Sequence, residues 1–80
     1  MAVKLELYRV FLEVAQQGNI SAAAQRLFIS QSAVSQSVKQ LEEQLQVRLF
    51  SRSTKGVNLT SEGKLLLEYV SHALGLLHSG

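Results

Sequence analysis

The length, composition and charge of this chain narrow the kinds of protein that it can be. Its 80 residues suffice for one small domain, and 46% hydrophobic residues without proline favour a compact helical fold over disorder. The absence of cysteine excludes a disulfide framework and a thiolate zinc site, and the net charge of +2 is only mildly basic. His72 and His78 lie near the C-terminus without a cluster of further ligands, so we expect no metal and no cofactor. No apolar run of membrane-spanning length and no signal-peptide pattern occur, which predicts a cytoplasmic protein without a membrane partner.

Two helices are predicted in the first third of the chain. Apolar residues recur every three or four positions over residues 4–17, the rhythm of an amphipathic helix, and Gly18 suits its C-terminal end. The alanine-rich stretch that follows predicts a short helix over residues 22–28. Ser21 would be its N-cap, because a hydroxyl there can accept a hydrogen bond from the first turn.

A third helix follows after a very short connection. Phe28 and Ile29 form the predicted turn, and Ser30 caps a helix over residues 31–45. The apolar stripe of this helix comprises Val34, Val38, Leu41 and Leu45. Two helices joined so tightly predict a helix-turn-helix.

The rest of the chain predicts a hairpin and a long helix. Residues 49–59 combine apolar positions, turn residues and a short alternating segment, which predicts a two-stranded wing. Thr60 then caps a helix over residues 61–78. The expected fold class is therefore mainly α, a winged helix-turn-helix with a three-helix core, a short β-hairpin wing and a long C-terminal linker or dimerisation helix. Residues 1–60 would form the winged helix-turn-helix domain and residues 61–80 the long C-terminal helix.

The polar side of the third helix carries the functional prediction. Opposite the apolar stripe lie Gln31, Ser32, Ser35, Gln36 and Lys39. Gln can bond adenine through two hydrogen bonds and Ser can serve several bases, so this composition suits a helix that reads the major groove. The alternative is a plain solvated face, although such faces are usually filled with better helix formers such as Lys and Glu.

Cations near the predicted wing are expected either for a nucleic-acid contact or for an ordinary solvated loop. Arg48, Arg52 and Lys55 lie in a segment, residues 44–61, that contains no acidic residue. At the wing, Arg52, Thr54 and Lys55 can contact phosphate or enter a narrow minor groove. Arg52 could instead pair with a glutamate of the same chain. The expected DNA-binding residues are Ser21, Ser30, Gln31, Ser32, Ser35, Gln36, Lys39, Arg52, Thr54 and Lys55.

The last helix is apolar on more than one side. A helix of this kind must be buried on more than one side, so we expect one part to pack on the winged domain and another on a second subunit. The residues expected at this homodimer contact are Leu67, Val70, Leu74 and Leu77. Dimerisation would place the two copies of the helix over residues 31–45 about one DNA turn, ~34 Å, apart. Alternatively, the second apolar side would cover another domain of a longer protein.

Four motifs at these intervals resemble a known family. The segments "SAAAQRL", "SQSAVSQSVKQLE", "LFSR" and "LTSEG" are similar to the N-terminal DNA-binding domain of LysR-type transcriptional regulators, over about residues 5–75. The resemblance implies binding to interrupted palindromes in double-stranded promoter DNA, as dimers or tetramers of dimers. It also implies base contacts from Gln31, Ser32 and Ser35, with other polar side chains on or near the DNA.

The sequence departs from the pattern of this family at several points. Many members have Pro where Ser32 stands, Arg at or next to Gln36, and Gly where Gln46 stands. The resemblance also implies a C-terminal domain that binds a small-molecule effector, and this chain stops before it, so we expect an excised fragment. A winged-helix protein-interaction or dimerisation module stays open as the alternative function. No nucleophile with a nearby base and no phosphate-binding loop stand out, so we expect no enzymatic activity.

Overall fold

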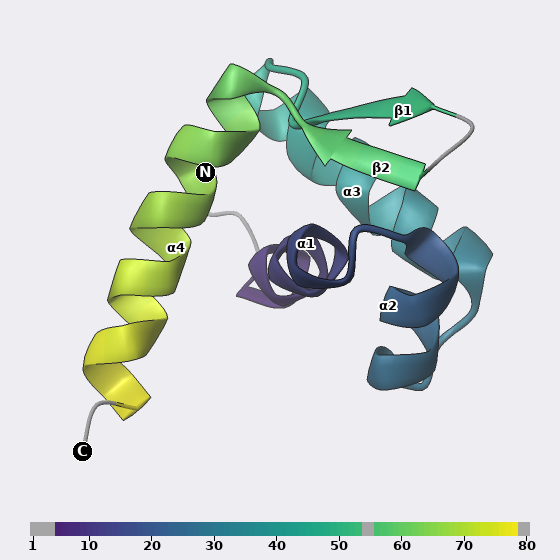
Figure 1. The fold of residues 1–80 in the computed structure, drawn as a ribbon, viewed down its shortest axis with the longest axis horizontal. Coiled ribbons are helices and arrows are strands. Elements are labelled where there is room, and N and C mark those ends of the chain that lie inside the picture. The colour runs from purple at the N-terminus through teal and green to yellow at the C-terminus, as the bar shows by residue number, and fades with distance from the viewer. Residues whose placement is uncertain (1–4, 54–55, 79–80) are drawn as a thin grey trace.

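The protein has the predicted order of elements. A computed structural model describes residues 5–53 and 56–78, and side chains in the last helix as far as Ala73. In chain order the elements are α1 (Leu5–Gln17), α2 (Ile20–Leu27), α3 (Gln31–Leu45), β1 (Phe50–Ser53), β2 (Gly56–Leu59) and α4 (Ser61–His78). Figure 1 shows α2 and α3 joined by a tight turn, with the hairpin extending beside α3. The winged helix-turn-helix prediction is confirmed.

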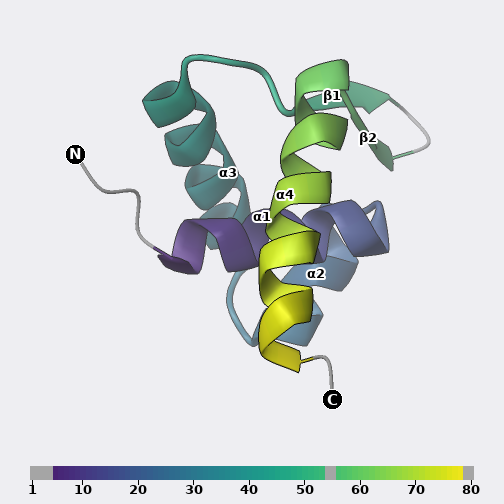
Figure 2. The same cartoon turned by 90° about the vertical axis from the view of Figure 1, so that its left-hand side faces the viewer.

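The core lies between the first three helices and the start of the hairpin. Its buried residues are Leu7, Val10, Phe11, Val14, Ala23, Ala24, Val34, Val38, Leu41, Leu49 and Phe50. The rings of Phe11 and Phe50 lie 5.3 Å apart at 45°, which ties α1 to β1. Helix α4 lies across α1 on the outside of this core (Figure 2). Within the part of the chain that the structure describes, no helix combines the length and the apolar character needed to span a bilayer.

The start of α2 corrects one prediction. The N-cap is Asn19 and not Ser21, because the Asn19 side-chain oxygen accepts the backbone N–H of Ala22 at 2.9 Å. The helix therefore begins at Ile20, and Ser21 lies inside its first turn. It ends at Leu27, since Phe28 adopts the left-handed conformation with φ of 58°.

Helix α3 has the predicted bounds. The Ser30 hydroxyl accepts the N–H of Ala33 at 3.0 Å, as expected of an N-cap. At the other end Gln46 has a left-handed φ of 59°, and its N–H bonds the carbonyl of Glu42. Gln46 thus ends the helix in a conformation that glycine adopts more readily.

The hairpin and α4 meet in a close contact. Strands β1 and β2 are antiparallel, with Phe50 opposite Leu59 and Ser53 opposite Gly56. Thr60 caps α4 as predicted, because its hydroxyl accepts the N–H of Gly63 at 3.0 Å. Gly63 is buried against this junction, and a Cβ atom there would overlap the carbonyl oxygen of Leu49.

Candidate nucleic-acid interface

The two sides of α3 differ as the sequence predicts. Val34, Val38 and Leu41 are buried in the core. The opposite side comprises Gln31, Ser32, Ser35, Gln36 and Lys39, which we call the reading surface. All five are exposed except Ser35, which is half-buried. The reading surface thus presents amides, hydroxyls and one ammonium to the solvent.

Ser21 lies beside the reading surface although it does not cap α2. The Gln31 side-chain amide nitrogen donates to the Ser21 hydroxyl at 3.4 Å. This contact places the first turn of α2 next to the first turn of α3.

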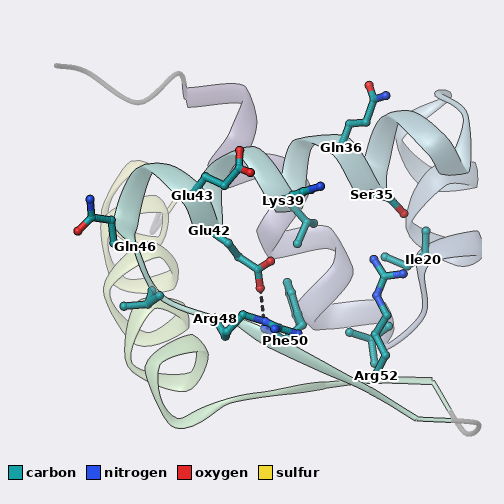
Figure 3. A pocket seen from close by; sticks show the side chains of 13 residues that line it. Ile20, Ser35, Gln36, Lys39, Glu42, Glu43, Gln46, Arg48, Phe50 and Arg52 are labelled. Carbon is teal, nitrogen blue, oxygen red and sulfur yellow. Dashed lines mark hydrogen bonds between the residues drawn. The ribbon is translucent and has the colours of Figure 1, made fainter.

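A groove runs between α3 and the hairpin (Figure 3). Its volume is about 660 Å³, and Val38, Val47, Phe50, Val57 and Ile20 provide apolar lining. Polar lining comes from Ser35, Gln36, Lys39, Glu42, Glu43, Gln46, Arg48 and Arg52. The groove is therefore continuous with the reading surface along α3, and its cations outnumber its acids.

Arg52 extends from β1 toward the α3 side of this groove (Figure 3). Among the side chains that the structure describes, the one ion pair joins Arg26 to Glu13, with Nε and Oε1 3.3 Å apart. Arg52 therefore has no carboxylate partner in the described part of the chain, contrary to the alternative of an internal ion pair. Thr54 and Lys55 lie outside the described residues.

The functional prediction missed Glu42. This half-buried side chain lies in the groove, and its Oε2 atom accepts the backbone N–H groups of Leu49 at 2.8 Å and Phe50 at 3.2 Å. A sequence signal existed: Glu42 lies four residues after Val38, on the edge of the buried stripe. A carboxylate at such a position needs hydrogen-bond donors from the fold.

Some apolar residues of α4 pack against the core, and others are exposed to the solvent. Leu66 and Leu67 pack against the core, and Val70 is half-buried. Leu65 and Tyr69 are 54% and 68% exposed. Of the predicted dimer residues, the side chains of Leu74 and Leu77 lie outside the described residues.

Fold and site together define a winged helix-turn-helix protein with an exposed polar second helix in its helix-turn-helix unit. The profile of the bacterial regulatory helix-turn-helix proteins of the lysR family matches residues 5–64. The chain belongs to this family.

Individual relatives agree with this assignment. The chain is 41% identical over 76 residues to the HTH-type transcriptional regulator PerR of Escherichia coli K12, covering 95% of this chain and 26% of PerR. It is 47% identical over 70 residues to the regulator ClcR of Pseudomonas putida, covering 88% of this chain and 23% of ClcR. The chain thus spans about a quarter of the length of these relatives.

Solved structures of the family share the fold. The DNA-binding domain of CbnR in complex with DNA superimposes with a TM-score of 0.87 and 36% identity, over 94% of this chain and 86% of that chain. The DNA-binding domain of BenM bound to catB site 1 DNA gives a TM-score of 0.89 and 28% identity, over 96% and 86% of the two chains.

Proposed function

We propose that this chain binds double-stranded promoter DNA in a sequence-specific manner, as the DNA-binding part of a LysR-type transcriptional regulator. Helix α3 would enter the major groove with the reading surface toward the base edges. The wing would lie on the adjacent backbone or minor groove. The target would be an interrupted palindrome bound by a homodimer, since a two-fold dimer presents two copies of α3.

The reading surface is the observation that carries this proposal. The buried residues of α3 lie on its opposite face, and the N-terminal part of the reading surface offers Gln31, Ser32 and Ser35. Amide and hydroxyl groups match the donors and acceptors of base edges, whereas carboxylates would repel phosphate. Ser30 and Ser21, at the starts of α3 and α2, would lie near the DNA backbone, where helix N-termini favour phosphate.

The groove supports a second contact with the same duplex. Lys39 and Gln36 on α3 and Arg52 on β1 line one groove. Arg52 has no carboxylate partner among the described residues, so it is available for phosphate. Each contact of a cation with phosphate adds to the salt dependence of binding. Thr54 and Lys55, which follow β1 in the sequence, would extend this contact.

The exposed apolar residues of α4 support a homodimer. Leu65 and Tyr69 are separated by one helical turn, and both project away from the core that covers Leu66 and Leu67. A second copy packed there would bury them. The predicted contact residues Val70, Leu74 and Leu77 instead continue the stripe of Leu66 and Leu67, so they would meet a second copy only where α4 extends past the core. Large exposed apolar side chains on one helix face are typical of such interfaces.

The relatives suggest the context of the whole protein. A regulator as long as these relatives would carry a further domain for a small-molecule effector. It would act in the cytoplasm and have no enzymatic activity. This chain would then supply the DNA contact and part of the dimer contact.

Selection of binding sites from random duplexes with the purified chain tests the proposal. We expect an interrupted palindrome, and an affinity that falls steeply between low and physiological salt. Recovery of no sequence preference would contradict it.

A protein-interaction module would behave differently. In that case, Gln31→Ala and Ser35→Ala would leave the function unchanged, whereas Leu65→Asp on α4 would abolish it. For a DNA-reading domain the first two substitutions change the recovered sequence.

A further inference from the structure

A carboxylate ties the end of α3 to the start of the hairpin. The Oε2 atom of Glu42 accepts the N–H groups of Leu49 at 2.8 Å and Phe50 at 3.2 Å. Figure 3 shows the hydrogen bond to Phe50. Hydrogen bonds to a carboxylate are shorter and about twice as strong as those between neutral groups. Glu42 therefore fixes the point at which β1 leaves α3.

The same short segment is held from the other side by α4. The Thr60 hydroxyl donates to the carbonyl of Arg48, and the Thr60 N–H donates to the carbonyl of Leu49 at 3.0 Å. Residues 48–50 are thus bonded to α3 through their N–H groups and to the start of α4 through their carbonyls. Because a two-stranded hairpin is only marginally stable alone, the position of the wing depends on such anchors.

The charge of Glu42 is unfavourable for the proposed DNA contact. It lies in the groove with Lys39 and Arg52, where a negative charge opposes the approach of phosphate. Glu43 lines the same groove but is exposed, and among the described residues it makes no hydrogen bond. Of these two neighbouring carboxylates, Glu42 is the one that bonds the backbone of the hairpin.

We propose that Glu42 is a positioning residue for DNA binding, an inference that rests on the proposed function. Its carboxylate sets the distance between the wing and α3, so that Arg52 and the reading surface engage one duplex at the same time. Without this tether, the base contacts of α3 remain available, but the contact of Arg52 with the backbone is lost. Glu42 itself does not touch the DNA.

A double-mutant cycle between Glu42 and Arg52 tests this inference. Binding of the 80-residue chain to its selected duplex is measured over a range of salt concentrations for wild type, Glu42→Ala, Arg52→Ala and the double variant. We expect each single substitution to lower the affinity about tenfold and to reduce the salt slope by about one. Arg52→Ala should lower the affinity of Glu42→Ala by less than about twofold, because the contact is already lost.

Matched variants separate the tether from the charge. Glu43→Ala removes a neighbouring charge. In this background, Arg52→Ala should still lower the affinity about tenfold. Glu42→Gln keeps an oxygen acceptor for the two N–H groups. In this background, Arg52→Ala should therefore still lower the affinity nearly as much as in the wild type. Amide exchange at Leu49 and Phe50 should accelerate in Glu42→Ala and not in Glu43→Ala. If Glu42→Ala does not fold, Glu42→Asp takes its place, since it keeps the charge on a side chain one carbon too short for the tether.

The outcomes distinguish this inference from the proposed function. Additive losses in the cycle, or equal effects of Glu42→Ala and Glu43→Ala, would overturn the positioning role while leaving DNA binding intact. A wild-type chain without sequence preference would overturn the proposed function itself.

Discussion

The reading surface and the junction between α3, the hairpin and α4 use their side chains in opposite ways. In the reading surface, Gln31 and its neighbours face the solvent. In the junction, Glu42, Thr60 and Gly63 hold or approach the backbone of residues 48–50. Substitutions in the reading surface should leave the fold intact. The junction maintains the position of the hairpin relative to α3, on which the proposed DNA contact depends. Binding and stability should therefore respond to different substitutions.

The largest expected effect is on stability, at the junction. Gly63→Ala would drive a Cβ atom into the carbonyl of Leu49, so α4 and the hairpin must separate. We expect the free energy of unfolding to fall by about 3 kcal/mol, the upper range of overpacking in a tight interior. Urea denaturation followed by circular dichroism measures this change.

Gly18→Ala is the matched control. Gly18 has a left-handed φ of 69°, and nothing lies within 4 Å of the added Cβ, so only backbone strain of about 1 kcal/mol applies. A Gly63→Ala loss no larger than this would show that the close approach at the junction is unimportant.

The next effect concerns binding alone. Gln31→Ala should leave the free energy of unfolding within about 0.5 kcal/mol, because its side chain is exposed. Discrimination at the base that it reads should weaken by about 1–3 kcal/mol. Titration of the selected duplex and its single-base variants measures this difference. Gln40→Ala on the same helix, outside the reading surface, should change neither quantity.

Substitution of Thr60, also in the junction, should lower the free energy of unfolding by less than substitution of Gly63. Thr60→Ala removes the cap of α4 and the hydrogen bond to Arg48, and we expect the free energy of unfolding to fall by about 1–2 kcal/mol. Thr60→Ser keeps the hydroxyl and should restore most of the stability. Equal losses in the two variants, measured by thermal unfolding, would exclude the hydroxyl as the cause.

The sequence predicted the reading surface better than the junction, and the reason is physical. The reading surface follows from helical periodicity, since Val34, Val38 and Leu41 determine which side of α3 faces the solvent. The junction depends on contacts between residues 7 to 14 positions apart, such as Glu42 with Leu49 and Gly63 with Leu49. Periodicity places Glu42 at the edge of the buried stripe, but neither periodicity nor capping patterns identify its partner on the hairpin or the close approach of Gly63 to Leu49.

The prediction of the N-cap of α2 was wrong, because capping preference alone does not decide where this helix starts. Ser21 and Asn19 are both good N-caps, and the choice between them depends on whether Ile20 joins the helix. Ile20 packs partly against the core, which favours the earlier start at Asn19. Tertiary packing thus decided between two equally plausible local signals.

The smallest expected effect is a gain in stability at the end of α3. Gln46 has a left-handed φ of 59° and an exposed side chain, so it carries backbone strain without compensating burial. Gln46→Gly should raise the free energy of unfolding by about 0.5–1 kcal/mol, because glycine adopts this conformation readily. Gln46→Ala, which removes the side chain but keeps Cβ, should bring no such gain in urea denaturation. Because Gln46 lies outside the reading surface, DNA discrimination should stay unchanged in both variants, and a change there would mean that the end of α3 takes part in recognition.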